Sequence, residues 1–231
     1  MNENLIFDLG FYNGDTSLPY LKEGYKVIGV DCNPKLGKIP NSGINTEIFN
    51  FMLNGQLTFV TKCISDKDDE IIDFYVQPNL MVWSSVNIAI AERCHKSICC
   101  QVETITLASL IKEYGTPIYC KIDIEGNDIL ALKSLFDVEE KPKYISCETE
   151  CIGTEHYSSI DGLENINTLH ELGYQKFFLV KQKCLDNFQF DINNQYEWKT
   201  YEEIVEELNR VRSAHNFSIP YSFWWDVYAT F

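Results

Sequence analysis

The amino-terminal segment most constrains the fold, because it joins a short apolar run to a turn with two glycines. Residues 5–9 form the run, with Asp8 near its end, and Gly10 and Gly14 flank the turn that follows. A parallel strand that enters a helix through such a turn brings its backbone close to a nucleotide-like ligand at the carboxyl edge of a sheet. The segment therefore predicts a strand, a ligand-binding turn and a helix, in that order.

A second apolar run leads to the same class of ligand. Residues 27–30 are followed by Asp31, and an acid at the tip of this strand is the group that hydrogen-bonds a ribose diol. A pyrophosphate-binding turn has the pattern G-x-G-x-x-G, but Tyr12 stands at its second glycine. Since the bulk of Phe11 and Tyr12 leaves little room for a pyrophosphate, we expect the smaller amino-acid end of S-adenosylmethionine there, with Asp8 balancing its amine.

Apolar runs alternate with helical patterns along the chain, which predicts a parallel sheet with helices on both faces. A last aromatic run, fed by a long connection, is typical of a strand that runs antiparallel to its neighbours. We therefore expect an α/β, Rossmann-like class I methyltransferase fold with a central, mostly parallel seven-stranded sheet and an antiparallel last strand, built as one domain over residues 1–231. The expected strands are residues 5–9, 26–31, 57–64, 118–123, 144–148, 176–180 and 223–229, with accessory strands at 71–76 and 102–105. The expected helices are residues 16–23, 46–54, 107–114, 127–135 and 163–172, with a further acidic helix at 201–207.

Charge and hydropathy exclude two classes of partner. With 19 basic and 34 acidic side chains, the formal net charge is −15, which would repel a phosphate backbone, so we expect no nucleic-acid partner. No apolar stretch is long enough to span a bilayer, and residues 1–4 lack the features of a signal peptide. These observations predict a cytoplasmic protein that binds a small molecule.

One compact group of cysteines and a histidine could be considered for a metal. Zinc sites usually need two separated pairs of ligands with regular spacing, and this group forms one knot. We therefore expect free thiols in a reducing compartment and no metal site. The group consists of Cys94, His95, Cys99 and Cys100.

The strongest chemical motif is the sequence KIDIEG at residues 121–126. Lys121, Asp123 and Glu125 alternate along a strand and its exit, so that they face the same side. Three charges on a buried face would be costly, which favours a cleft at the carboxyl end of the sheet. An ion pair of Lys121 with either acid is the alternative. His156 is a third candidate for acid–base work because its ordinary pKa lies near neutrality, unless it is a solvent-exposed loop residue.

Taken in order, these motifs resemble the FkbM-type family of S-adenosylmethionine-dependent methyltransferases. The resemblance covers nearly the whole chain, although residues 150–220 match loosely, and its most recognisable stretch is residues 121–126. Many members have Ala-Asn where Phe11 and Tyr12 stand, and a glutamate where Asp31 stands. The segments that carry the resemblance are residues 7–14, 27–34, 64–68, 84–85, 104–110, 121–126 and 224–229.

The resemblance implies a set of residues for the cofactor S-adenosylmethionine. Asp31 would contact the ribose, Ile64 and Ser65 would flank the adenine, and Asp123 and Glu125 would lie beside the transferable methyl group. The residues expected to bind the cofactor are Asp8, Gly10, Tyr12, Asn13, Gly14, Thr16, Asp31, Cys32, Ile64, Ser65 and Asp123.

Family members mostly methylate hydroxyl oxygens, which implies an O-methyltransferase for a sugar, glycan or related small molecule. Asp123, Glu125 or His156 would be the general base. Mg²⁺ could assist, but no dedicated third ligand is evident, so we expect a metal-free reaction. A non-catalytic scaffold is disfavoured by the presence of both acids, and a nicotinamide-dependent oxidoreductase by the bulky turn. Residues 188–198 would either stack on a sugar ring or form a packed loop.

Overall fold

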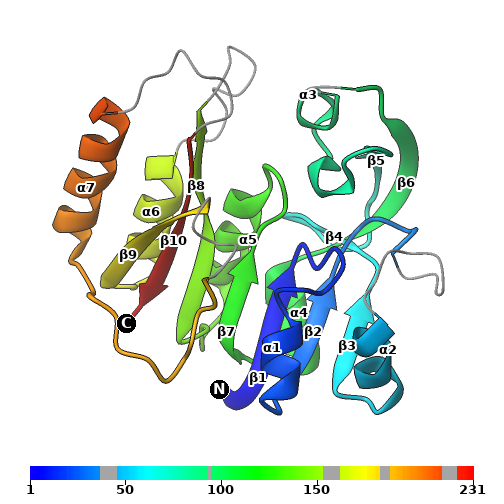
Figure 1. The fold of residues 1–231 in the computed structure, drawn as a ribbon, viewed down its shortest axis with the longest axis horizontal. Coiled ribbons are helices and arrows are strands. Elements are labelled where there is room, and N and C mark those ends of the chain that lie inside the picture. Colours follow the sequence, from blue (N-terminus) through cyan, green and yellow to red (C-terminus); the bar gives the residue numbers. More distant parts are fainter. Residues whose placement is uncertain (37–45, 93–94, 153–161, 183–187, 215–222) are drawn as a thin grey trace. The chain divides into compact units, whose positions relative to one another are not determined.

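The computed structural model describes residues 1–36, 46–92, 95–152, 162–182, 188–214 and 223–231. The chain divides into two compact units, Met1–Pro142 and Lys143–Phe231. Each unit is built around strands whose apolar residues are buried, with helices packed beside them (Figure 1).

The first unit contains four parallel strands in the order β3-β2-β1-β7. Their apolar residues form near-continuous buried runs, as expected for strands covered on both faces. Helices α1 and α4 lie on opposite faces of these strands (Figure 1). The strands are β1 (Asn2–Leu9), β2 (Lys26–Val30), β3 (Leu57–Val60) and β7 (Pro117–Ile122). The helices are α1 (Leu18–Lys22), α2 (Thr46–Leu53), α4 (Leu107–Tyr114), α5 (Asp128–Ser134) and the short η2 (Leu135–Asp137).

A three-stranded sheet is inserted between β3 and β7 in the sequence, and we call residues 63–105 the insertion. Its strand order is β4-β6-β5, with β4 parallel and β5 antiparallel to β6. The expectation of one strand over residues 57–64 is wrong, because the chain leaves the parallel sheet after Val60 and Cys63 pairs with Thr104 instead. Its elements are β4 (Cys63–Ile64), β5 (Ile71–Val76), η1 (Met81–Trp83), α3 (Ile88–Ala91) and β6 (Ile98–Ile105).

The second unit contains three strands in the order β8-β10-β9, and β10 runs antiparallel to both neighbours. The expected fold class is confirmed: seven strands, four of them parallel in the first unit, with the last strand antiparallel in the second. The strands are β8 (Tyr144–Ile152), β9 (Lys176–Lys181) and β10 (Phe223–Thr230), and the helices are α6 (Gly162–Glu171) and α7 (Tyr201–Ala214).

Aromatic side chains of residues 188–198 pack within the second unit. The Tyr196 ring stacks on Phe178 of β9 with 4.7 Å between centroids, and Phe178 in turn stacks on Tyr228 of β10 at 4.8 Å. Phe190 is buried and stacks on Tyr228 as well. Because these ring faces already contact one another, the structure favours the packed loop over a surface for stacking a sugar.

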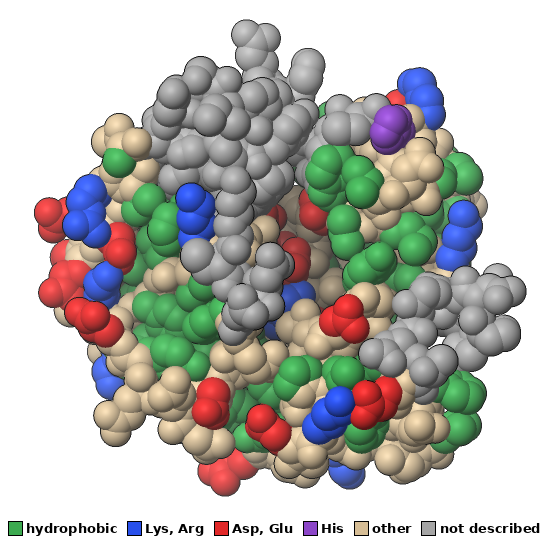
Figure 2. Space-filling model, in the orientation of Figure 1, with side chains coloured by type: hydrophobic (Ala, Val, Ile, Leu, Met, Phe, Trp, Pro, Cys, Tyr) green, Lys and Arg blue, Asp and Glu red, His purple; other side chains and the backbone are tan. Residues whose placement is uncertain are grey.

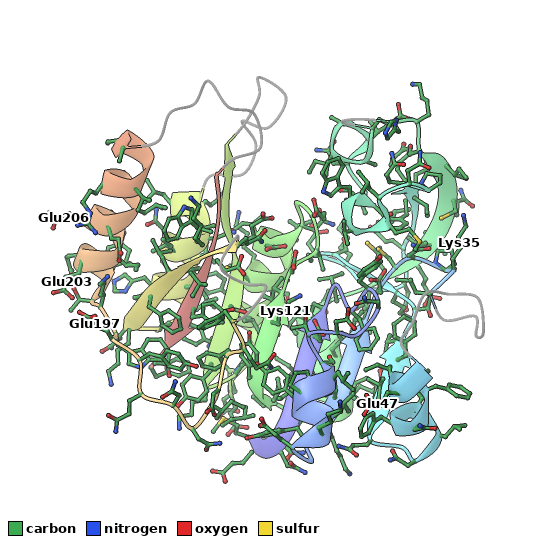
Figure 3. The ribbon with its side chains drawn as sticks, in the orientation of Figure 1. Lys35, Glu47, Lys121, Glu197, Glu203 and Glu206 are labelled. Atoms are coloured by element: carbon green, nitrogen blue, oxygen red, sulfur yellow. The ribbon has the colours of Figure 1, made fainter. Side chains whose placement is uncertain are left out.

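Helix α7 is amphipathic. Ile204 and Leu208 are buried, whereas Glu202, Glu203 and Glu206 are exposed. The space-filling view shows acidic side chains along this edge, and Figure 3 labels Glu203 and Glu206 there (Figures 2 and 3). The acidic run is therefore a solvated helix face.

Candidate functional site

Asp8 is a deeply buried acid near the carboxyl end of β1, with 2% of its surface exposed. Its Oδ2 accepts a hydrogen bond of 2.6 Å from the Ser17 hydroxyl, and its Oδ1 lies 3.4 Å from Lys121 Nζ. Thr16, the expected cofactor residue, is exposed, and α1 begins only at Leu18. Ser17 is thus the hydroxyl that reaches Asp8, and the sequence signal for it was a serine directly before an apolar helix.

The turn after β1 depends on glycine for both conformation and space. Gly10 has φ +87°, and a Cβ there would lie 1.8 Å from the Asp123 carbonyl oxygen. Gly14 has φ +81°, and a Cβ there would lie 2.6 Å from the Phe11 ring. Side chains disfavour this left-handed region, so both positions require glycine. Gly10 also brings the first turn into contact with the segment after β7.

Phe11 does not fill the ligand side of this turn, in contrast to the expectation from its bulk. Its ring is 2% exposed and points into the core, where it packs edge-on against Phe59 at 5.4 Å between centroids. Gly29 of β2 makes room for it, since a Cβ at Gly29 would lie 2.3 Å from the ring. Only Tyr12 of the two bulky residues is partly exposed. Phe11 therefore takes no space from a ligand at this turn, and only the Tyr12 side chain could narrow the space for a pyrophosphate.

Asp31 lies directly after β2 and accepts two backbone hydrogen bonds. The Tyr12 N–H donates to Oδ2 at 2.8 Å, and the Asn33 N–H donates to Oδ1 at 2.8 Å. Burial raises the pKa of Asp31 to about 6, although both N–H groups act to lower it. Each carboxylate oxygen keeps a second lone pair that could accept a hydroxyl hydrogen bond. Asp31 therefore braces the first turn, with Tyr12 at φ +49°, and can still contact a diol.

Two buried polar atoms at this edge have no hydrogen-bond partner within the described part of the chain. They are Asp8 Oδ1, an acceptor in β1 that also lies 3.4 Å from Lys121 Nζ, and Asn33 Nδ2, a donor that follows the neighbouring parallel strand β2. Buried polar atoms are normally satisfied, so this pair fits a ligand with both kinds of group, as the amino-acid and ribose parts of S-adenosylmethionine have. Asn33 is not among the cofactor residues predicted from the sequence. Asn13 is among them, but its side chain makes a local hydrogen bond, in which Nδ2 donates to Asp15 Oδ2 at 2.6 Å.

The expected adenine residues belong to the insertion. Ile64 of β4 is buried, and its carbonyl accepts a bond of 3.2 Å from Asn127 Nδ2. Ser65 is also buried, and its hydroxyl donates to Asp66 Oδ1 at 3.2 Å. Cys32 is half-buried, and a hydrogen bond with the Cys63 thiol, together with burial, raises its pKa well above the usual range. Asn127 thereby links Ile64 to the segment that carries the acids.

Lys121 lies between two acids at the end of β7. Its Nζ is 3.2 Å from Asp123 Oδ2 and 3.4 Å from Asp8 Oδ1, and Figure 3 labels it between the side chains of β7 and β1. The side chain of Asp123 is 41% exposed. The ion pair that the sequence analysis gave as the alternative is therefore present with Asp123, and it leaves the Asp123 carboxylate accessible to solvent.

Glu125 does not continue the strand alternation. Strand β7 ends at Ile122, and Glu125 lies in a turn with φ +49°. The turn is closed by a bond of 3.1 Å from the Ile124 N–H to Asp128 Oδ1. Glu125 is half-buried and is placed by this turn, not by the pleat of the strand.

Two candidates from the sequence, His156 and Cys94, lie outside the described residues. Glu148 is 5% exposed and lies inside β8, opposite Asp226 of β10, instead of at a strand end. Among the described residues, no group of three or more His, Cys, Asp or Glu side chains could hold a metal ion. The described helices include none that is both long and apolar enough to cross a membrane.

Known proteins resemble the chain in sequence and in structure. The model of the methyltransferase FkbM domain family matches residues 8–176. A solved S-adenosylmethionine-dependent methyltransferase from Archaeoglobus fulgidus aligns at 12% identity and TM-score 0.42, over 100% of this chain and 87% of that one. A precorrin-6y C5,15-methyltransferase from Geobacter metallireducens aligns at 10% identity and TM-score 0.43, over 99% and 80%. No curated protein matches the sequence.

The structural likeness is too weak to carry an argument about function, so the assignment depends on the family model. That model includes the turn after β1, Asp31 and the acids after β7, and it covers well over half of the chain. The chain belongs to the FkbM family and is an S-adenosylmethionine-dependent methyltransferase.

Proposed function

We propose that the chain transfers a methyl group from S-adenosylmethionine to a hydroxyl oxygen of a sugar, glycan or related small molecule. The observation that supports this most is the accessible Asp123 carboxylate, 41% exposed and 3.2 Å from Lys121, directly after β7. A carboxylate in this place can take the proton of a hydroxyl group. The proposal includes a single domain over residues 1–231 that acts in the cytoplasm, on an acceptor other than nucleic acid, as the net charge of −15 supports.

The cofactor would be held mainly by the exits of β1 and β2. Asp31 would accept the ribose hydroxyls, and Asp8 with Asn33 would meet the polar groups of the amino-acid part or the ribose. Ile64 and Ser65 would lie at the adenine. When bound, S-adenosylmethionine supplies an electrophilic methyl group on a sulfonium.

The protein has two tasks in the reaction. It must hold the acceptor hydroxyl in line with the S–CH₃ bond at near-attack distance, and it must take the proton that the oxygen loses as the O–CH₃ bond forms and the S–CH₃ bond breaks. Asp123 is the base that the geometry supports best, because its carboxylate is accessible. Glu125 would orient the hydroxyl or take its place as base, and His156 remains a candidate by sequence.

The first experiment is a calorimetric titration of the purified chain with S-adenosylhomocysteine, with NAD as the control ligand. We expect saturable binding of S-adenosylhomocysteine alone. The acceptor class is then tested with S-adenosylmethionine labelled in its methyl group and a panel of sugars, glycans and amines. Label on a hydroxyl oxygen supports the proposal, whereas label on a nitrogen, or binding of NAD alone, contradicts it.

The reaction is expected to proceed without a divalent cation. Treatment with EDTA, followed by addition of Mg²⁺, should leave the rate of methyl transfer unchanged. A rate that is lost with EDTA and restored by Mg²⁺ would instead assign the carboxylates after β7 to a metal.

A further inference from the structure

The turn that carries Glu125 has an unusual backbone. Glu125 has φ +49°, and Gly126 follows with φ +103°. A residue with a side chain is disfavoured in the left-handed region, so it persists there only where neighbouring contacts hold it. The turn is therefore held by contacts from elsewhere in the chain in addition to its own hydrogen bond from the Ile124 N–H to Asp128 Oδ1.

The first such contact is a hydrogen bond from Ser85. Its Oγ donates to the Glu125 carbonyl oxygen at 2.7 Å, across 40 residues of sequence. Ser85 is 1% exposed, and its backbone is held to Tyr75 of β5 by two hydrogen bonds of 2.9 and 3.2 Å. Its Oγ also accepts the Asn87 N–H at 3.0 Å. The hydroxyl accepts from Asn87 with one of its lone pairs and donates its hydrogen to the Glu125 carbonyl.

Two further contacts come from the insertion. The Ile90 side chain of α3 packs on Gly126 so closely that a Cβ at Gly126 would lie 2.8 Å from Ile90 Cδ1. Asn127 Nδ2 donates to the Ile64 carbonyl at 3.2 Å. Ser85, Ile90 and Ile64 thus hold three successive residues of the turn.

We propose that Ser85 is a positioning residue for methyl transfer, which holds the turn in the conformation that presents the Glu125 carboxylate to the acceptor hydroxyl. The inference rests on the proposed function. Its physical basis is that a hydrogen bond to the Glu125 carbonyl fixes the peptide plane on one side of a strained residue. Without that bond the turn can relax toward right-handed conformations, and the carboxylate moves with it.

The neighbouring serine provides a matched control. Ser84 is also buried, and its Oγ accepts the Gln77 N–H at 3.0 Å within the insertion. Ser84→Ala removes a buried hydroxyl of the same size from the adjacent residue. Ser85→Thr keeps a hydroxyl at the position that bonds Glu125.

The test uses the sugar or glycan of the panel above that takes up the methyl label fastest. It measures kcat and KM for that compound, and the Kd of S-adenosylhomocysteine, in Ser85→Ala, Ser85→Thr, Ser84→Ala, Glu125→Gln and the double variant Ser85→Ala/Glu125→Gln. We expect Ser85→Ala to lower kcat by about 10- to 100-fold, with Kd changed less than about twofold. Ser84→Ala should keep the wild-type kcat, and Ser85→Thr should restore most of it. In the Glu125→Gln background, Ser85→Ala should have little further effect, because coupled residues are not additive.

Several outcomes would overturn the inference while leaving the methyltransferase proposal intact. They are an unchanged kcat in Ser85→Ala, an unchanged kcat in Glu125→Gln, or an equal loss from Ser85→Ala with and without Glu125. Equal losses from Ser84→Ala and Ser85→Ala would mean that the hydroxyls only stabilise the insertion, which thermal unfolding of both variants would report. Failure of the proposed function looks different, since the wild-type protein would then bind no S-adenosylhomocysteine and transfer no methyl group.

Discussion

The two turns at the carboxyl ends of β1 and β7 lie against each other but are held in different ways. Residues 10–17 are fixed mainly by contacts with the core and with β2: the Phe11 ring packs in the core against Gly14, and Asp31, directly after β2, accepts the Tyr12 N–H. Residues 123–127 are fixed from the insertion, through Ser85, Ile90 and Ile64. The first turn has its glycines and its apolar residues in the local sequence, whereas the second is supported by residues 36 to 63 positions away.

This difference indicates which of the two turns can change its conformation without disturbing the core of the parallel sheet. A turn supported by the core of the parallel sheet cannot change without disturbing that core. A turn supported by an insertion can shift when the insertion changes, while the strands keep their register. We therefore expect cofactor affinity to depend mainly on the first turn and turnover on the second.

The largest effect should come from Gly10→Ala, which breaks the contact between the two turns. The new Cβ would overlap the Asp123 carbonyl oxygen at 1.8 Å in addition to the strain of φ +87°. We expect a loss of about 3 kcal/mol or more in the free energy of unfolding, or a chain that does not fold. Gly24→Ala is the control, because φ is +97° there and no atom lies within 4 Å of the added Cβ. Equal losses of unfolding free energy in both variants, measured by denaturant unfolding, would show that the contact between Gly10 and Asp123 does not contribute to stability.

Asp123→Asn should separate turnover from binding at the second turn. The amide keeps the shape of the side chain but cannot take a proton, so we expect kcat to fall by about 100-fold or more. The Kd of S-adenosylhomocysteine should change much less, since the first turn carries the cofactor contacts. If calorimetry shows affinity falling as much as kcat, Asp123 is a cofactor anchor.

Asp31→Ala should have the opposite effect: the affinity for the cofactor should fall more than kcat at saturating cofactor. Hydrogen bonds to a charged group contribute about 1.5–3 kcal/mol each, so affinity should fall by at least about tenfold. The Tyr12 N–H also loses its acceptor. An unchanged Kd in calorimetry would mean that the ribose binds elsewhere.

The pH dependence of the first turn follows from the same carboxyl. In the folded protein the pKa of Asp31 is about 6, above its ordinary value of 3.8, so the folded state holds this proton more tightly than the unfolded state. The contribution of Asp31 to the free energy of unfolding therefore falls as pH rises from 3.8 to about 6, and is constant above.

Cofactor binding should show the reverse trend, because the ionised carboxylate is the better acceptor. Affinity for S-adenosylhomocysteine should fall by up to about tenfold per pH unit below pH 6, and Asp31→Asn should remove most of this dependence. A wild-type affinity that is flat between pH 5 and 7 would contradict the assignment of Asp31 to the ligand.

The smallest effect concerns Asp68 of the insertion, which supports the start of α4. Asp68 accepts the Thr106 N–H at 2.6 Å and the Ser109 hydroxyl at 2.7 Å. Loss of one such hydrogen bond costs about 1 kcal/mol, so Asp68→Ala should lower the unfolding midpoint modestly. Asp66→Ala, two residues earlier and also exposed, is the control. A large loss of kcat in Asp68→Ala at full stability would mean that this end of the insertion also reaches the site.

Much of the fold followed from local pattern. The helix at 107–114 was predicted with its bounds, because Thr106 caps a regular apolar periodicity. The strand at 57–64 was not, because apolar content alone does not show that the chain leaves one sheet after Val60 and joins another at Cys63. Similarly, the bulk of Phe11 was visible in the sequence, but the direction of its ring depended on the space that Gly29 leaves in the adjacent strand.

The sequence by itself determined the strand–turn–helix order, the need for glycine at Gly10 and Gly14, and the position of acids at the ends of β1, β2 and β7. These properties depend on backbone conformation and on side-chain periodicity, which neighbouring residues set. Only the tertiary structure decided that Lys121 also reaches Asp8, and that Ser85 holds the turn of Glu125. Such contacts join residues from 40 to more than 110 positions apart, and only the packing of the sheet and its insertion brings them within hydrogen-bonding reach.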